Sequence, residues 1–160
     1  MSRREVKRGS PLAFTCGDPA GVGPEIIADW LRCNRRDARD VAVIGPRRWL
    51  ETLDTSAVKI AVGPSGVFPR PGRPGAAGAR LAWAAMERAA EGCKTGEFSG
   101  VVTGPVSKAE LARVGYEFPG QTEFFAARWG GEPVMAFCGG KLRVALATWH
   151  VPLVAVPRLL

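Results

Sequence analysis

The chain has 160 residues, of which 46% are hydrophobic, and this composition is enough for one folded core and favours a single domain. Its formal net charge is +7, drawn partly from a basic tail over residues 1–10 and partly from a cluster at Arg35, Arg36 and Arg39. Because no aromatic residues are interleaved with these cations, we interpret them as solvated surface and expect no nucleic-acid partner. Apolar runs are too short for a membrane span or a signal peptide, so we expect a cytoplasmic protein without a membrane partner.

The first predicted element is a short apolar strand over residues 12–16, followed by the glycine-rich turn Gly17–Gly23. A helix is then predicted from Pro24 to about Leu31, because proline suits the first helical position. Gly45 and the proline after it stop the next strand. The sequence predicts a strand, a short helix and another strand in the following stretch: residues 41–44, 47–53 and 58–62.

A stretch rich in proline and glycine, from Gly63 to Gly75, is predicted to be a surface loop. Residues 76–90 are the clearest helix, because Leu81, Ala85 and Met86 fall on one face. The remaining predicted elements are a strand, two helices and the two strands of a hairpin: residues 101–103, 108–114, 123–129, 134–137 and 142–147. Strands alternate with helices, which is typical of the α/β class with a mostly parallel sheet and flanking helices.

Cysteines and the end of the chain give two further expectations. The four cysteines have neither C-x-x-C spacing nor a histidine cluster, which excludes a zinc ribbon and favours reduced core residues. From Pro152 the sequence indicates the start of an apolar helix that stops at Leu159 and Leu160 without a cap. A domain rarely ends by exposing the start of an apolar helix, so we expect a truncated chain.

Two segments follow predicted strands and bring polar groups to the carboxyl edge of the sheet, where ligands bind in α/β proteins. The turn Gly17–Pro24 carries Asp18 and matches neither the dinucleotide fingerprint nor the P-loop. Its glycines either present N–H groups to an anion or form a tight structural turn. Residues 101–108 include Thr103 and end on Lys108, which either contacts a phosphate or carboxylate or is an ordinary exposed lysine.

Two further segments place polar side chains near a predicted helix start and a predicted strand end. In Gly120–Phe125, Gln121 and Thr122 are candidates to hydrogen-bond a ligand, with the alternative that Thr122 caps the helix. In Leu146–Pro152, His150 is the only histidine of the chain. A single histidine is by default a structural residue or a general base, and its imidazole is also the commonest metal ligand.

Taken in this order, the four segments resemble the N-terminal half of the 4-hydroxythreonine-4-phosphate dehydrogenase family of pyridoxal phosphate biosynthesis. Each motif alone is weak, whereas four in the right order at similar intervals are a strong match. The resemblance covers about residues 12–160 and is weakest over residues 35–78. The segments that carry it are Gly17–Pro24, Thr103–Lys108, Gly120–Phe125 and Arg143–Leu153.

The resemblance implies a fold similar to isocitrate and isopropylmalate dehydrogenases, with residues 11–160 as the N-terminal part of a two-domain, homodimeric subunit. It implies an oxidoreductase that uses NAD and a divalent metal (zinc, magnesium or cobalt) to oxidise 4-phosphohydroxy-threonine to the 2-amino-3-oxo acid. His150 falls on a metal-ligand histidine and Thr122 on a substrate-binding threonine. Gln121 stands where the family has a substrate-binding histidine. Asp18 and Lys108 belong to family motifs and are assigned to catalysis; no residue is assigned to NAD.

Two departures from the family pattern leave alternatives open. Gln121 keeps a hydrogen-bonding side chain but loses a titratable one, so oxidation of a phosphorylated sugar acid or an aromatic cis-dihydrodiol is an alternative activity. The chain is about half the family's length, and one histidine cannot build a three-histidine metal site. We therefore do not expect catalysis by this polypeptide alone, and a non-catalytic remnant or interaction module is the third interpretation.

Overall fold

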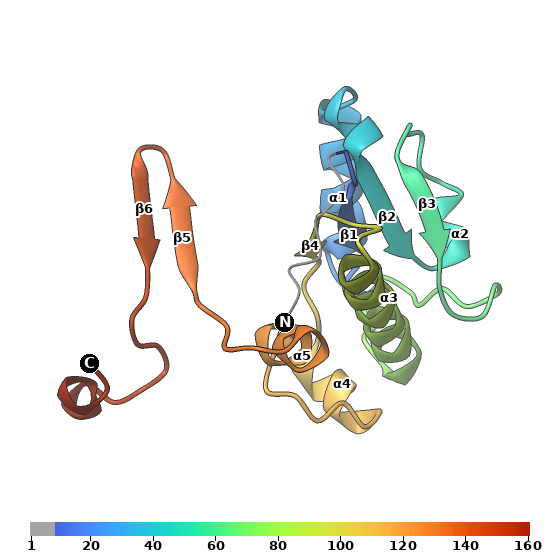
Figure 1. Ribbon diagram of the computed structural model, residues 1–160. Helices are drawn as coiled ribbons and strands as arrows, with labels where there is room; N and C mark the ends of the chain where they lie inside the picture. Colours follow the sequence, from blue (N-terminus) through green and yellow to red (C-terminus); the bar gives the residue numbers. More distant parts are fainter. Residues whose placement is uncertain (1–8) are drawn as a thin grey trace. The chain divides into compact units, whose positions relative to one another are not determined.

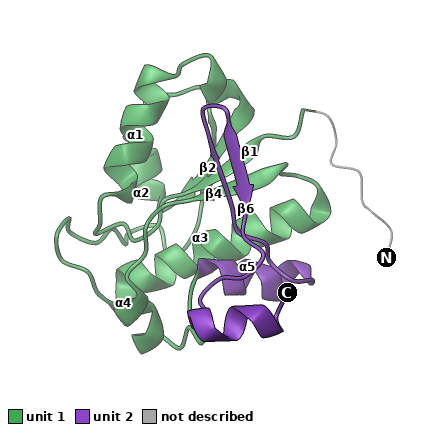
Figure 2. Cartoon of the chain, turned by 90° about the vertical axis from the view of Figure 1, so that its left-hand side faces the viewer, with its two compact units in different colours: residues 1–120 green, residues 121–160 purple. Residues whose placement is uncertain are grey.

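The computed structural model describes residues 9–160 and divides the chain into two compact units, residues 1–120 and 121–160 (Figures 1 and 2). The basic tail predicted for residues 1–10 lies almost wholly outside the described residues. In the described part of the chain, every helix is too short or too polar to cross a bilayer. The α/β class predicted from the alternation of elements is confirmed.

A parallel sheet forms the centre of the first unit, with the strand order β3-β2-β1-β4. Parallel pairing sets Thr15 of β1 opposite Ile44 of β2 and Thr103 of β4, so these strands end at one edge. Every residue of β2 is buried, as expected for a central strand covered on both faces. The strands are β1 (Leu12–Thr15), β2 (Val41–Gly45), β3 (Val58–Ala61) and β4 (Gly100–Thr103).

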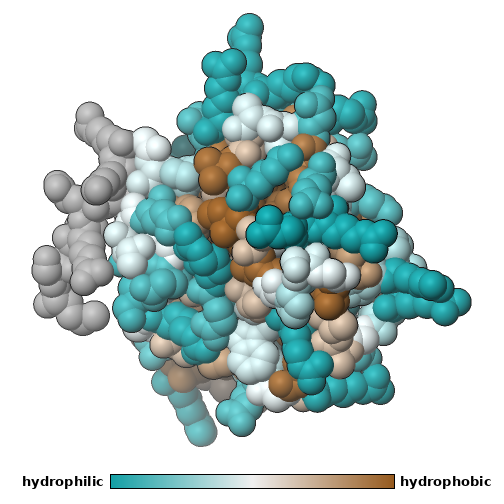
Figure 3. Space-filling view, turned by 90° about the vertical axis from the view of Figure 1, so that its right-hand side faces the viewer, coloured by the Kyte–Doolittle hydropathy of each residue, from teal (hydrophilic) through white to brown (hydrophobic). Residues whose placement is uncertain are grey.

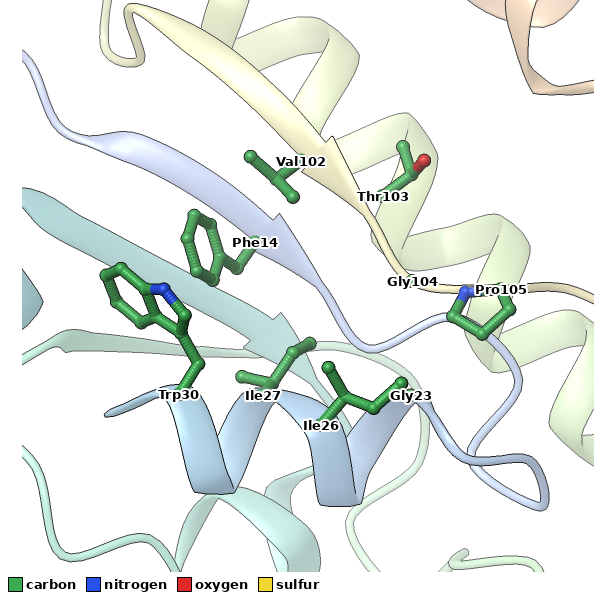
Figure 4. A pocket seen from close by; sticks show the side chains of 9 residues that line it. All are labelled: Phe14, Gly23, Ile26, Ile27, Trp30, Val102, Thr103, Gly104 and Pro105. Atoms are coloured by element: carbon green, nitrogen blue, oxygen red, sulfur yellow. The ribbon is translucent and has the colours of Figure 1, made fainter. Parts of the chain in front are cut away.

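Helices α1 and α3 lie on opposite faces of this sheet (Figures 1 and 4). On one face, the ring of Trp30 from α1 lies 5.0 Å from the ring of Phe14 in β1. On the other face, Ala85 and Ala89 of α3 are fully buried, and their small side chains let the helix approach the strands closely. The helical elements of this unit are α1 (Gly23–Cys33), η1 (Asp37–Asp40), α2 (Arg47–Leu50), α3 (Ala76–Thr95) and α4 (Lys108–Arg113).

Helix α3 is longer than the sequence predicts, ending at Thr95 instead of residue 90. Gly92 lies inside the helix, where the ring of Phe98 occupies the space that a side chain would need. Gly96 does end the helix, in the left-handed conformation with φ of 79°. Gly92 therefore serves close packing against Phe98, whereas Gly96 ends the helix.

The second unit contains an α-helix, an antiparallel hairpin and a short 3₁₀ helix. Leu142 of β6 pairs with Gly139 of β5, which confirms the predicted hairpin, although both strands are shorter than expected. Helix α5 begins at Gln121 instead of residue 123, so Thr122 lies inside its first turn and the alternative in which Thr122 caps the helix is wrong. The elements are α5 (Gln121–Trp129), β5 (Ala136–Gly139), β6 (Leu142–Ala145) and η2 (Leu153–Arg158).

The cysteines are all unpaired thiols, but only one of them belongs to the core. Cys16 is fully buried and Cys93 is half-buried, whereas Cys33 and Cys138 are exposed. The expectation of four core residues is thus wrong for Cys33, the last residue of α1, and for Cys138, in a hairpin whose residues are all exposed. Apolar sequence neighbours do not guarantee burial where a strand has no covering layer.

Candidate functional site

The turn after β1 and the loop after β4 are joined by backbone hydrogen bonds at the carboxyl edge of the sheet. The N–H of Asp18 donates to the carbonyl of Pro105 at 2.9 Å. The N–H of Gly104 donates to the carbonyl of Thr15, also at 2.9 Å. Main-chain hydrogen bonds alone therefore hold the two predicted site segments of the first unit side by side.

Two glycines make this close approach possible. Gly17 adopts a φ of 67°, and a side chain on it would collide with the carbonyl oxygen of Pro105. A Cβ on Gly104 would lie 2.7 Å from the carbonyl oxygen of Cys16. The geometry supports the structural interpretation of these glycines, since both positions are filled by neighbouring backbone.

Asp18 is almost completely buried at the centre of this arrangement. Its Oδ1 accepts the N–H of Ala20 at 2.9 Å, which closes an Asx turn inside the glycine-rich segment. Helix α3 passes against the carboxyl group at Gly78, where a Cβ would lie 2.5 Å from Oδ1. The carboxylate of Asp18 thus fixes the shape of the turn and its contact with α3.

Lys108 lies at the start of α4 with its side chain exposed at the same edge of the sheet. The hydroxyl of Ser107 accepts the N–H of Glu110 at 3.4 Å and so caps the start of α4. The carboxylate of Glu110 does not return a bond to Ser107 but pairs with Arg113 at 2.6 Å. Among residues 9–160 the ammonium group of Lys108 has no ion-pair partner, so it is available to an anionic ligand.

An apolar pocket of about 450 Å³ lies between α1 and strands β1 and β4. Figure 4 shows the side chains of Phe14 and Val102 facing Trp30 and Ile27 of α1, while Thr103 projects from β4 on the other side of the strand. The side chains that line the pocket are mostly apolar, and Gly23, Gly104 and Pro105 complete the lining. Such a pocket accepts apolar groups and offers no titratable side chain for catalysis.

Two residues at the end of β1 were not singled out from the sequence. Thr15 is fully buried, and its hydroxyl oxygen has no hydrogen-bond partner among the described residues. The Cys16 thiol donates to the carbonyl of Gly17 at 3.1 Å, and burial raises its pKa to about 12. A thiol held neutral in this way is a packing group and not a nucleophile. Thr15 and Cys16 are buried because β1 lies between β2 and β4, and this strand order cannot be read from the sequence.

The other three predicted site residues belong to the second unit. Thr122 is exposed and Gln121 half-buried in the first turn of α5. His150 lies five residues after β6, exposed, in a left-handed conformation with φ of 54° that is rare for residues other than glycine. Its ring packs at 4.9 Å from the ring of Trp149. The structure thus places Asp18 and Lys108 in one unit, and Gln121, Thr122 and His150 in the other.

The donor groups of the chain fit only part of a metal site. The exposed imidazole of His150 is a suitable ligand for a divalent ion. Within residues 9–160, however, no three His, Cys, Asp or Glu side chains gather as a metal-binding group. A complete divalent site would therefore need ligands from outside the described residues.

Known proteins match most of this chain. It matches the family described as "pyridoxal phosphate biosynthetic protein PdxA" over residues 22–160. It is 38% identical to a 4-hydroxythreonine-4-phosphate dehydrogenase from Zymomonas mobilis, in an alignment that covers 89% of this chain and 49% of the relative. The crystal structure of a 4-hydroxythreonine-4-phosphate dehydrogenase from Klebsiella pneumoniae superposes with a TM-score of 0.78 at 25% identity, covering 93% of this chain and 54% of that one.

A terephthalate 1,2-cis-dihydrodiol dehydrogenase from Burkholderia xenovorans has a TM-score of 0.70 at 23% identity, over 93% of this chain and 51% of its own, which is a likeness of fold alone. The chain spans about half the length of the curated relatives that it matches. The family match, by contrast, extends over most of this chain, through all of α1 and on to Leu160. The chain therefore belongs to the PdxA family, of whose members it corresponds to the N-terminal part.

Proposed function

We propose that this chain forms part of an NAD- and divalent-metal-dependent dehydrogenase that oxidises 4-phosphohydroxy-threonine in pyridoxal phosphate biosynthesis. The observation that carries the proposal is the family match over residues 22–160, which includes the Thr122 and His150 segments. The relative from Zymomonas mobilis is itself named a 4-hydroxythreonine-4-phosphate dehydrogenase. The product would be the 2-amino-3-oxo acid, and the working form a homodimer.

In the first unit, we assign Lys108 and Asp18 to the reaction. Lys108 carries an exposed cation at the carboxyl edge of the sheet, where it would hold the phosphate or carboxylate of the substrate. The buried carboxylate of Asp18 would act through the turn that it closes, because its Oδ1 already accepts the N–H of Ala20. Asp18 is then a positioning residue, which keeps the turn and the loop after β4 together.

In the second unit, Thr122 and Gln121 would hydrogen-bond the substrate and His150 would be one metal ligand. The hydroxyl of Thr122 is exposed in the first turn of α5 and can donate or accept. A divalent ion bound to the substrate would polarise its hydroxyl group and lower the pKa of that group. Because the described residues offer one histidine, the other ligands would come from a part of the enzyme that this chain does not include.

The test is complementation. The purified 160-residue chain is mixed with NAD, a divalent metal salt and 4-phosphohydroxy-threonine, with and without the separately expressed C-terminal half of the Zymomonas mobilis relative. We expect NADH to form in the complemented mixture only. Turnover by the lone chain would refute our expectation that it is inactive alone. Absence of turnover in a mixture whose two halves co-elute on size exclusion would contradict the proposed activity.

Matched variants locate the effect within the chain. His150→Ala should abolish NADH formation in the complemented mixture, whereas Lys141→Ala, at the exposed turn of the hairpin, should leave it within about twofold. Lys108→Gln should raise the KM for substrate more than it lowers kcat if the ammonium group binds the anionic substrate. Equal losses in His150→Ala and Lys141→Ala would point to a folding defect of the second unit and would remove the support for the metal ligand.

Gln121 favours a second candidate, oxidation of a phosphorylated sugar acid or an aromatic cis-dihydrodiol. An amide at this position keeps a hydrogen-bonding group but cannot become cationic, so the contact differs from the one that the family's histidine makes with 4-phosphohydroxy-threonine. A panel of the three substrate classes, tested on the complemented enzyme before and after Gln121→His, separates the two candidates. The second candidate requires that Gln121→His shift the preference from a sugar acid or dihydrodiol toward 4-phosphohydroxy-threonine.

A further inference from the structure

A second pocket, about 480 Å³ in volume, opens between α2 and the loop over residues 63–75. Arg48 and Arg70 contribute a cation from each side, and the described residues that line it include none of those assigned to the dehydrogenase reaction. The volume lies within the usual range for small-molecule sites, about 300–1,000 Å³. The remaining lining residues are Trp49, Thr52, Phe68, Pro69 and Pro71.

The loop side of this pocket is held rigid. Arg70 stands between two prolines, and its carbonyl accepts the N–H of Arg73 at 3.1 Å. Pro71 and Gly72, with a φ of 75°, occupy the two central positions of that turn, which is the pattern of a type II turn. The N–H of Gly72 donates to the carbonyl of Ala20 at 2.8 Å, which ties the loop to the glycine-rich turn. The backbone that carries Arg70 is therefore fixed before any ligand binds.

The helix side is equally fixed. Trp49 is 5% exposed, and its ring fills the space above Gly45, where a Cβ would lie 2.7 Å from it. This anchors α2, so that Arg48 is carried by a helix that cannot shift freely. The hydroxyl of Thr52 donates to the carbonyl of Trp49 at 2.7 Å and keeps its oxygen available as an acceptor.

Within the part of the chain that the structure describes, the two guanidinium groups have no counter-charge. Neither Arg48 nor Arg70 has an ion pair or a side-chain hydrogen bond within residues 9–160. Elsewhere in the unit exposed arginines do find partners, as in the pair Arg35–Asp54 at 3.3 Å. On the side of the unit that carries α2 and β3, hydrophobic patches, drawn in brown, lie between hydrophilic side chains (Figure 3).

We propose that this pocket binds a small organic phosphate. Arg48 and Arg70 would hold the phosphate oxygens by charge-assisted hydrogen bonds, for which the planar guanidinium is well suited. The apolar or aromatic body of the ligand would rest against Phe68 and the flanking prolines.

Calorimetric titration of the 160-residue chain with phenyl phosphate and with inorganic phosphate tests the proposal. We expect phenyl phosphate to bind about tenfold more tightly, because only it can use the apolar wall. Arg48→Gln and Arg70→Gln should each weaken it by about tenfold, and the double variant should show no saturable binding. Equal affinity for inorganic phosphate, or binding retained by the double variant, would overturn the proposal.

Arg39→Gln is the matched control, because it removes the same charge from η1, just before β2 and so at the opposite edge of the sheet. The affinity of this variant for phenyl phosphate should stay within about twofold of the parent. A loss of affinity equal to that of Arg48→Gln would mean that net charge, and not the pocket, accounts for the binding. Arg70→Lys keeps the charge but loses the planar guanidinium group, so its affinity for phenyl phosphate should lie between that of the parent and that of Arg70→Gln. The titration uses neither NAD, metal nor a complementing half, so its result is independent of the proposed dehydrogenase activity.

Discussion

The two units of this chain differ in where they keep their apolar side chains. In residues 9–120, the central strand β2 is buried at every position and helices cover both faces of the sheet. In residues 121–160, every residue of β5 and β6 is exposed, and Leu153 and Leu160 have exposed fractions of 86% and 82%. A two-stranded hairpin is marginally stable by itself. The first unit thus carries its own core, whereas the hairpin of the second unit leaves its apolar side chains exposed.

The sharpest test of this difference compares one phenylalanine from each unit. Phe98 is 2% exposed and packs against Gly92 of α3, whereas Phe137 in β5 is 58% exposed. Phe98→Ala should lower the free energy of unfolding by about 3–5 kcal/mol, the usual cost of removing a buried ring. Phe137→Ala should change it by less than about 0.5 kcal/mol.

Urea denaturation followed by circular dichroism measures both variants. Similar losses in the two would mean that the β5 side chain is buried in solution, and the contrast between the units would fail. A small loss for Phe98→Ala alone would mean that the first unit tolerates a cavity beside α3, against the dense packing described above.

Hydrogen exchange tests the same contrast without substitution. Backbone N–H groups of β2 are covered on both faces and flanked by β1 and β3. Those of the β5–β6 hairpin have only each other. Amide exchange should therefore be at least about a hundredfold slower in β2 than in the hairpin, because local opening of the hairpin exposes no core. Equal protection, measured by mass spectrometry of peptides from each region, would contradict this.

Much of the first unit could be predicted from the sequence because its signals are local. The strand at Leu12–Thr15 and the helix that opens at Pro24 follow from an apolar run, a glycine turn and a proline at the first helical turn. The hairpin around Gly140 follows in the same way from two apolar runs flanking a glycine pair. Element type and approximate position are set by such neighbours in sequence.

Features that depend on strand order could not be predicted. Nothing local indicates that Asp18 donates to Pro105, because β4 joins β1 across eighty residues of intervening chain. The same holds for the pocket that pairs Arg48 with Arg70, which come from different elements. Placement of Thr122 inside α5 shows a third limit, since the helix begins at Gln121, two residues earlier than a threonine cap would require.

Two glycines from different regions test whether close packing or backbone flexibility explains the presence of glycine. Gly104 and Gly139 both have φ values that other residues adopt, so an added methyl group tests space alone. Gly104→Ala would place Cβ 2.7 Å from the Cys16 backbone and should destabilise the protein by about 1–3 kcal/mol. Gly139→Ala meets nothing within 4 Å and should be neutral within about 0.5 kcal/mol. The melting temperatures of both variants measure this difference. A melting temperature for Gly104→Ala equal to that of the parent would contradict the prediction.

The smallest expected effect concerns the thiols. Burial raises the pKa of Cys16 to about 12 from an ordinary value of 9.0, while Cys138 is exposed. In the unfolded chain the Cys16 thiol ionises above pH 9, whereas in the folded chain it stays neutral to about pH 12. Its contribution to stability is therefore complete below pH 9 and is lost as the pH rises from there toward 12.

Between pH 8 and pH 10, the free energy of unfolding of the parent should therefore fall by about 1 kcal/mol more than that of Cys16→Ala. Iodoacetamide at pH 8 should modify Cys138 and Cys33 within minutes and leave Cys16 unmodified until denaturant is added, as peptide mass spectrometry would show. Cys16 modified as fast as Cys138 would mean that the joined loops of the first unit open as readily as the hairpin of the second. In that case the edge that carries Asp18 and Lys108 could not be treated as preformed.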